Sequence, residues 1–204
     1  MGRPTSPKLS VERIVDTAMD IVDGDGMDAL TMRAISKRLG TKSASLYHHI
    51  EDRDTLIDGM IDRVMKAIDL TPIDHPDLST ALLGQALAFL DAVAKHPNLA
   101  EMIAIRPVRS SASFTYYELM LARLTETGMA PNDALCVLYA IDDYVLGAAV
   151  NNNDNIDLDG RESDFPLLAR ARGATPRQRR LALEAIIDGL TAPKGIRTHA
   201  RSTR

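Results

Sequence analysis

The sequence predicts an all-α protein, and two observations carry that prediction. Apolar residues recur at three- and four-residue spacing through nearly the whole chain of 204 residues, and no stretch reads as a convincing strand. Apolar residues make up 45% of the chain, which is enough to bury a real core. Proline, glycine and polar clusters interrupt the periodic segments and set the expected ends of the helices.

The first 70 residues predict a helix-turn-helix domain of three helices, followed by a bridging helix. Ser10 and Thr31 are good N-caps for the first and second helices, and the second ends at Gly40. The run Asp-Gly-Asp-Gly after the first helix is expected to stop it. The four predicted helices cover residues 11–23, 32–40, 43–49 and 51–68.

The proline-containing break at 70–76 marks the expected domain boundary. Helices are predicted beyond it over 79–95, 99–105, 112–127, 131–151, 164–172 and 176–190, with a polar loop over 151–160. The two ends lack apolar periodicity, so residues 1–9 are expected to be a flexible arm and residues 193–204 a disordered basic tail. The chain thus divides into a first domain over 1–70 and a second over 71–192.

Bulk composition narrows the class of protein. The net charge is −4, so any nucleic-acid-binding face must be a local patch. Cys136 is the only cysteine, which excludes an intrachain disulfide and fits a reducing compartment. No apolar run approaches the roughly 18 residues of a membrane span, and the N-terminus lacks the apolar segment of a signal peptide. We therefore expect a cytoplasmic protein without a membrane partner.

The most informative stretch is 29–50, which predicts two short helices joined by a tight turn at Gly40. The chain has no acid between Asp28 and Glu51, although four basic residues lie there: Arg33, Lys37, Arg38 and Lys42. A helical hairpin with one basic face is how a helix-turn-helix presents a helix to the major groove of double-stranded DNA. The alternative is that this face is only a solvated surface.

The spacing LGxxxxxLYxHxxxRxxL, from Leu39 to Leu56, resembles the N-terminal domain of the TetR (tetracycline repressor) family. The segments HPNLAEMIAIRP at 96–107, YVLGAAV at 144–150 and LALEAIIDGL at 181–190 resemble the tetracycline-repressor branch more loosely. The resemblance implies a homodimer with a C-terminal domain for effector binding and dimerisation. It also implies a repressor that a small molecule releases from a near-palindromic operator. The alternative is a DNA-binding regulator controlled by a protein partner, or one without a small ligand.

Candidate DNA contacts follow from residue chemistry and from the family match. Thr31 at a helix N-terminus is an expected phosphate anchor, and Lys42, Ser43 and Ala44 are expected at base edges. Tyr47, His49 and Arg53 match the family as phosphate clamps. The full candidate set is Arg3, Thr31, Arg33, Lys42, Ser43, Ala44, Ser45, Tyr47, His48, His49 and Arg53.

The resemblance also implies an effector pocket in the second domain. It places Gln85 and Phe89 in this pocket, and Ile105, Arg106 and Pro107 in its wall, whereas Tyr116, Met120 and Asp143 are candidates because they are expected to face inward. Met102 stands where the prototype has a magnesium-ligating histidine, and a thioether is a poor ligand for a hard cation. We therefore expect no metal or cofactor, and an apolar or amphipathic effector. The alternative is that these are ordinary core residues.

The helices at 131–151 and 176–190 are predicted to form a four-helix bundle across a two-fold axis, as the resemblance implies. The expected interface residues are Leu138, Val145, Gly147, Ala148, Ile186, Gly189 and Leu190. The alternative is burial of both helices within one chain. An enzyme is not expected, because the sequence has no nucleophile elbow, phosphate-binding loop or zinc-ligand spacing, and no catalytic residue is assigned.

Overall fold

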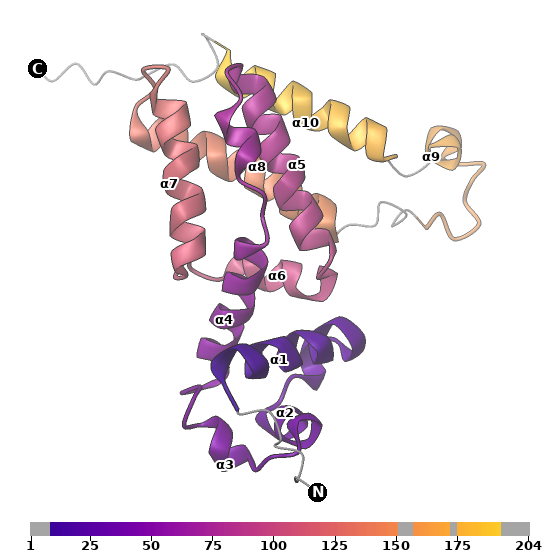
Figure 1. The fold of residues 1–204 in the computed structure, drawn as a ribbon. Coiled ribbons are helices and arrows are strands. Elements are labelled where there is room, and N and C mark those ends of the chain that lie inside the picture. Colours follow the sequence, from indigo (N-terminus) through magenta and orange to yellow (C-terminus); the bar gives the residue numbers. More distant parts are fainter. Residues whose placement is uncertain (1–8, 151–156, 172–174, 193–204) are drawn as a thin grey trace, which may run out of the picture.

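The computed structural model describes residues 9–150, 157–171 and 175–192, which form helices and no strand (Figure 1). The predicted fold class, all-α, is confirmed. The helices are α1 (Val11–Asp25), α2 (Met32–Leu39), α3 (Ser43–Leu46), α4 (Arg53–Lys66), α5 (Leu78–Ala94), α6 (Pro97–Ile105), α7 (Ser111–Thr125), α8 (Pro131–Val150), α9 (Pro166–Arg170) and α10 (Pro176–Thr191). Single 3-10 turns, η1 (Met27–Ala29) and η2 (Thr71–Asp74), lie between them. The predicted arm with Arg3 and the predicted basic tail lie outside the described residues, except for Leu9.

Helix α1 is two residues longer than the sequence predicted, because Gly24 stays helical and Gly26 ends the helix. Gly26 has φ +81°, a backbone conformation that L side chains rarely adopt, and its N–H donates to Val22 O at 2.9 Å. The predicted cap at the other end is confirmed, since the Ser10 hydroxyl accepts from the N–H of Arg13.

Helix α3 is shorter than predicted: it ends at Leu46, and Tyr47 to His49 form a turn instead of a further helical turn. Lys42 makes no side-chain cap at its N-terminus, and the three residues after Leu46 are all exposed. A four-residue helix without a cap or a continuous apolar stripe has little to propagate it. Leu46 and Ile50 are nevertheless buried on either side of the turn and belong to the hydrophobic core.

The long helices follow the predicted boundaries to within two residues, and side-chain caps define several of their first residues. Asp52 caps α4 by accepting from Thr55 N at 2.7 Å, and Asp77 caps α5 by accepting from Thr80 N at 2.8 Å. Thr175 and Gln178 form a reciprocal capping box at the start of α10.

Helix α4 connects the two groups of helices in Figure 1. It contacts α1 in the lower group and α5, α6 and α7 in the upper group. Helix α6 runs across the junction between the groups and contacts α1, α4, α5 and α8 (Figure 1). Helices α5, α6, α7, α8 and α10 form the upper group, with α6 at its lower edge, while α9 lies apart from it (Figure 1). The expected boundary near residue 70 stays a prediction.

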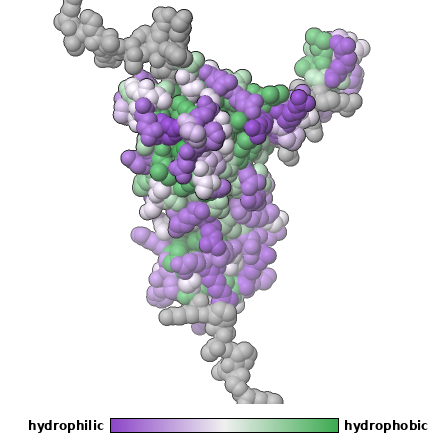
Figure 2. Space-filling view, turned by 45° about the horizontal axis from the view of Figure 1, so that its top comes forward, coloured by the Kyte–Doolittle hydropathy of each residue, from purple (hydrophilic) through white to green (hydrophobic). Residues whose placement is uncertain are grey.

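The surface of the lower group is mainly hydrophilic, as the lower half of Figure 2 shows. Apolar residues are more frequent on the upper group and on α9, where Leu167 is 73% exposed. Within the described residues, no single helix is long and apolar enough to cross a membrane. Only α5 and α6 taken together reach that length and composition, and they meet at a bend of 119°.

Candidate functional site

The helical hairpin of α2 and α3 is fixed by its own backbone and by two serines. Gly40 adopts the left-handed conformation with φ +66°, and Thr41 N donates to Ser36 O at 2.9 Å. The buried Ser36 hydroxyl donates to Arg33 O at 3.0 Å and lies 2.9 Å from the Ser43 hydroxyl. This geometry sets the position of α3 against α2.

The serine pair changes the role available to Ser43. Each hydroxyl has one proton, and either serine can be the donor of this bond. When the Ser36 proton bonds Arg33 O, Ser43 donates to Ser36 and keeps only acceptor capacity for another partner. The expected place of Ser43 at a base edge stays a prediction.

Most of the predicted DNA contacts lie on the surface. The exposed ones are Thr31, Arg33, Lys42, Ala44, Tyr47, His48, His49 and Arg53, and Ser43 and Ser45 are half-buried. Thr31 also caps α2, since its hydroxyl accepts from Ala34 N at 3.1 Å. The hairpin thus presents a basic, acid-free surface, with the N-terminus of α2 at Thr31.

Arg53 has a structural role that sequence reasoning missed. Its Nε donates to Leu30 O and its Nη2 to Met27 O, both at 3.4 Å. These bonds tie the start of α4 to the chain that precedes α2. Although the side chain is exposed, its removal would disturb the hairpin itself as well as any phosphate contact.

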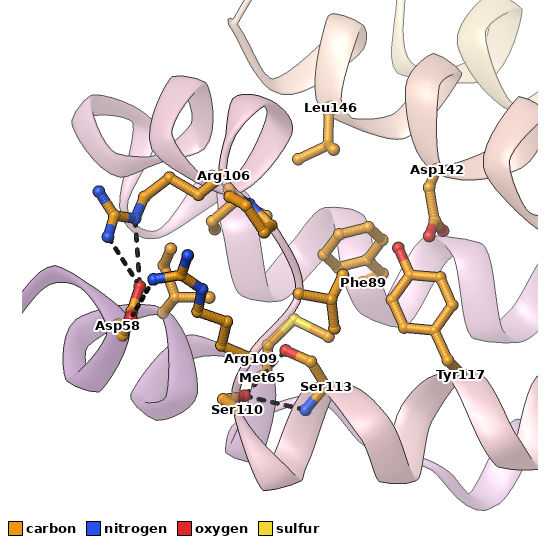
Figure 3. Close-up of a pocket in the computed structure, with 14 residues that line it drawn as sticks. Asp58, Met65, Phe89, Arg106, Arg109, Ser110, Ser113, Tyr117, Asp142 and Leu146 are labelled. Atoms are coloured by element: carbon orange, nitrogen blue, oxygen red, sulfur yellow. Dashed lines mark hydrogen bonds and ion pairs between the residues drawn. The ribbon is translucent and has the colours of Figure 1, made fainter. Parts of the chain in front are cut away.

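A second candidate site is a cavity of about 40 Å³ between α4, α5, α7 and α8 and the connection from α6 to α7 (Figure 3). Apolar side chains make up much of its wall, including Met65, Phe89 and Leu146. Charged groups lie at two places: Asp58, Arg106 and Arg109 together at one side, and Asp142 at the other (Figure 3). The volume suffices for a few water molecules and not for a ligand of ordinary drug size.

Asp142 on α8 is 4% exposed and lies beside two tyrosines of α7. The Tyr116 hydroxyl donates to its Oδ1 at 3.2 Å, and the Tyr117 hydroxyl faces the same carboxyl group (Figure 3). Within the described residues, Oδ2 has no hydrogen-bond partner. Burial raises the pKa of Asp142 to about 7, although the two hydroxyls act to lower it.

Both ends of α6 are bound to the lower group of helices. At its C-terminus, Arg106 donates to Asp58 at 3.0 and 3.1 Å and to Asp54 at 3.1 Å, both on α4. These carboxylates raise the pKa of Arg106 against the effect of its burial. At the N-terminus, His96 Nδ1 lies 2.8 Å from Asp23 Oδ2, and Asn98 donates to Val22 O. One wall of the cavity is therefore joined to the helices that carry the hairpin.

The structure separates the predicted effector residues into three sets. Phe89, Arg106 and Pro107 line the cavity. Gln85, Tyr116 and Met120 are fully buried in the core, Met102 is half-buried, and none of the four lines this cavity. Ile105 is 66% exposed and Asp143 is exposed, so the expectation that Asp143 faces inward is corrected.

Gln85 on α5 is a fully buried polar residue. Its Nε2 donates to Asp69 O at 3.1 Å, while its Oε1 has no partner among the residues that the structure describes. The amide therefore joins α5 to the chain that follows α4. No group of three histidine, cysteine or acidic residues in the described chain is placed to hold a metal ion.

Sequence reasoning missed Asp142, Tyr117 and Asp58 as lining residues. A signal for Asp142 was present. It lies four residues after Leu138 and three before Val145, so helical spacing puts it on their face, whereas Asp143 is rotated by about 100°.

Two of the predicted dimer contacts are corrected. Leu138 and Val145 are fully buried within the subunit's own core, so neither is available to a second copy. Ala148 and Leu190 are half-buried, as are Gly147 and Ile186, and Gly189 is exposed. A Cβ added at either glycine would meet no atom within 4 Å, so the backbone is open to close approach at both positions.

Two family models match the chain. One, described as bacterial regulatory proteins of the tetR family, matches residues 14–60, and the other, a tetracyclin repressor-like C-terminal domain, matches residues 71–177. The chain is 31% identical over 150 residues to the HTH-type transcriptional repressor DrrR1 of Streptomyces coeruleorubidus. This match covers 72% of the chain and 55% of that protein, so the chain spans little more than half of this relative.

Two further proteins are similar along most of their length. Tetracycline repressor protein class C of Escherichia coli is 25% identical over 185 residues, which cover 89% of this chain and 83% of that one. The crystal structure of the Streptomyces coelicolor TetR family protein ActR in complex with actinorhodin has a TM-score of 0.74 at 26% identity. It covers 92% of this chain and 97% of that one.

Proposed function

The chain belongs to the TetR family of bacterial regulatory proteins, and on that premise we propose that it is a ligand-responsive transcriptional repressor. It binds a near-palindromic DNA operator as a homodimer, and a small apolar or amphipathic effector releases it. Regulators of this family are generally not enzymes. DrrR1 and the class C protein are both named as repressors, which supports repression as the sign of control.

The observation that carries this proposal is the exposed basic face of the α2–α3 hairpin. Lys42 and Ala44 lie at the start of α3, where they can reach base edges in the major groove. Tyr47 and His49 lie exposed in the turn that follows, where they can bind phosphate oxygens. The serine pair inside the hairpin holds this surface rigid.

The cavity and the contacts of α6 support a two-state mechanism. A ligand larger than a few waters has to widen the cavity, and displacing the connection from α6 to α7, which begins at Arg106, is one way to do so. Because Arg106 is bound to Asp54 and Asp58 on α4, such a movement shifts α4 and the hairpin attached to it. The ligand changes the equilibrium only by its differential affinity for the two states.

The dimer is proposed to form through α8 and α10. TetR-family homologues are dimeric. The outer face of α10 carries the 53% exposed Leu181 and the open backbone at Gly189, while Leu183 and Ile187 on its inner face pack into the subunit. Two hairpins separated by one helical turn of DNA, roughly 34–36 Å, then read the two halves of the operator.

The DNA partner is tested by capturing fragments of the source genome on the purified protein at physiological salt and sequencing them. We expect enrichment of a near-palindrome.

Lys42→Ala is expected to lower operator affinity about ten- to hundredfold and to relax the preference at one base position. Tyr47→Ala should weaken all sequences alike. The matched control is Lys95→Ala, which removes an exposed lysine at the C-cap of α5, paired with Asp91, and should leave DNA binding unchanged. If no sequence is enriched, or if both hairpin variants bind like the wild type, the α2–α3 hairpin is not the DNA-binding surface.

The dimer is tested by sedimentation of the free protein. We expect Leu181→Glu to convert a particle of two chains into one of a single chain, because it places a charge in an apolar contact. The control is Leu119→Glu at an exposed position on α7, which should sediment as the wild type does. A wild-type monomer would contradict the proposed assembly.

A further inference from the structure

We propose that Asp142 selects the ligand of the cavity, and that this ligand carries a protonated amine at the end that enters first, attached to an apolar ring. The inference rests on the proposed function in one respect only, namely that the cavity is taken as the effector site. It assigns the chemical class of the effector, and it assigns Asp142 a role in specificity.

The carboxyl group of Asp142 has an unmade hydrogen bond. Asp142 lines the cavity and is almost fully buried; its Oδ1 accepts from Tyr116, and the Tyr117 hydroxyl faces the same carboxyl group (Figure 3). Its Oδ2 has no partner among the described residues. A buried polar atom without a partner costs about 1–3 kcal/mol. A donor on a ligand would remove that cost, so the cavity favours ligands that carry one.

The charge of the Asp142 carboxylate also limits which ligand donors suit the cavity. A carboxylate in a low-dielectric site requires a cation nearby, and a neutral donor leaves the charge uncompensated. The two cavity arginines do not supply that cation, because Arg106 and Arg109 both pair with Asp58 (Figure 3). Burial raises the pKa of Asp142 to about 7, and a cation beside the carboxyl group would lower this pKa by favouring the carboxylate. A protonated amine supplies charge and donor together, in the stronger, charge-assisted form of the bond.

Much of the remaining cavity wall is aromatic or aliphatic. The rings of Phe89 and Tyr117 line the cavity beside Asp142, and Met65 and Leu146 complete an apolar surface (Figure 3). Aromatic faces attract a cation as well as a flat ring. An amine attached to an apolar ring therefore matches the chemistry of Asp142 and of the walls, and the cavity has to widen beyond its volume of about 40 Å³ to admit the ring.

The test uses four matched compounds on each of three rings: benzene, naphthalene and anthracene. Each ring carries an aminomethyl, hydroxymethyl, methyl or carboxylate group. Binding to the full chain is measured by calorimetry and by thermal shift at neutral pH, where the amine is protonated. We expect the aminomethyl compound on at least one ring to bind the wild type at least tenfold more tightly than its hydroxymethyl counterpart.

Two variants separate Asp142 from its neighbour. Asp142→Asn keeps the shape and an acceptor for Tyr116 but removes the negative charge, so it should lose the preference for the amine. Asp143→Asn makes the same change at the adjacent, exposed position and should retain it. If Asp142→Asn does not fold, Asp142→Ser takes its place. The order of affinities of the four compounds for the wild type is a test that needs no variant.

Three results would overturn the proposal. They are no preference for the amine in the wild type, a preference that survives in Asp142→Asn, and no binding by any compound of the panel. The genome-capture experiment is scored separately on the same proteins. Operator binding without amine selectivity refutes only the role of Asp142. Amine selectivity without operator binding refutes only the proposed function.

Discussion

Asp142 and Asp143 are adjacent in the chain but lie in opposite environments. Adjacent helical residues point about 100° apart, so Asp142 is buried beside Tyr116 while Asp143 is exposed. The serines of the hairpin make the same point, because the bond between Ser36 and Ser43 decides which lone pairs remain for DNA. Residue type alone predicts the chemistry of a side chain, and its environment decides whether that chemistry is available.

The buried carboxyl group predicts a pH-dependent stability. Asp142 has an ordinary pKa of 3.8, which burial raises to about 7 in the folded protein. Between these values the unfolded chain releases a proton that the folded chain keeps, so stability falls as pH rises from about 4 to about 7 and then levels off. The slope reaches at most about 1.4 kcal/mol per pH unit.

The measurement is the free energy of unfolding of the wild type minus that of Asp142→Asn, from urea titrations at several pH values. The difference cancels the other carboxylates, and Asp143→Asn serves as the control. A difference that does not vary between pH 4 and pH 7 would mean that Asp142 titrates normally.

The ends of the elements depend on local backbone chemistry more than on the apolar pattern. The pattern predicted every helix that the structure describes, but glycine positions alone did not reveal where α1 ends. Gly24 is helical, whereas Gly26 has φ +81° and ψ 172°. The two glycines look alike in the sequence, and only their backbone angles separate them. Helix α3 ends early for a related reason, since nothing caps or continues it.

These two glycines give opposite predictions for one substitution. Gly24→Ala should stabilise the protein by about 0.5–1 kcal/mol, because alanine suits a helix interior and its Cβ meets no atom within 4 Å. Gly26→Ala should destabilise it by about 1–3 kcal/mol, because its backbone conformation is strained for an L side chain. Thermal unfolding of the two variants beside the wild type checks both signs. Equal effects would contradict the assigned end of α1.

On the scale of the whole molecule, α6 joins the cavity to the hairpin. Its N-terminus is bound to the end of α1 through His96 and Asn98, and its C-terminus to α4 through Arg106. Each of these contacts links residues about 48 to 76 positions apart in the chain. Neither helical periodicity nor charge counting indicates such pairs.

The contact of Arg106 predicts a stability effect that its neighbour should not share. Arg106→Met leaves the half-buried Asp58 without its main partner, and we expect a loss of about 1–3 kcal/mol. Arg109 is 60% exposed and 3.9 Å from Asp58, so Arg109→Met should change stability by less than about 0.5 kcal/mol. Urea unfolding of both variants measures the difference. Equal losses of stability would contradict the assignment of Arg106 as the main partner of Asp58.

The fold class, the order of the helices and the hairpin with its basic face could all be predicted from the sequence. Those features follow from periodicity, caps and local charge, which act over a few residues. Only the folded structure shows which polar groups face the cavity, that Arg53 bonds to the chain before α2, and that Leu138 and Val145 belong to the subunit's core. Such outcomes depend on contacts between residues far apart in the chain, which no local pattern contains.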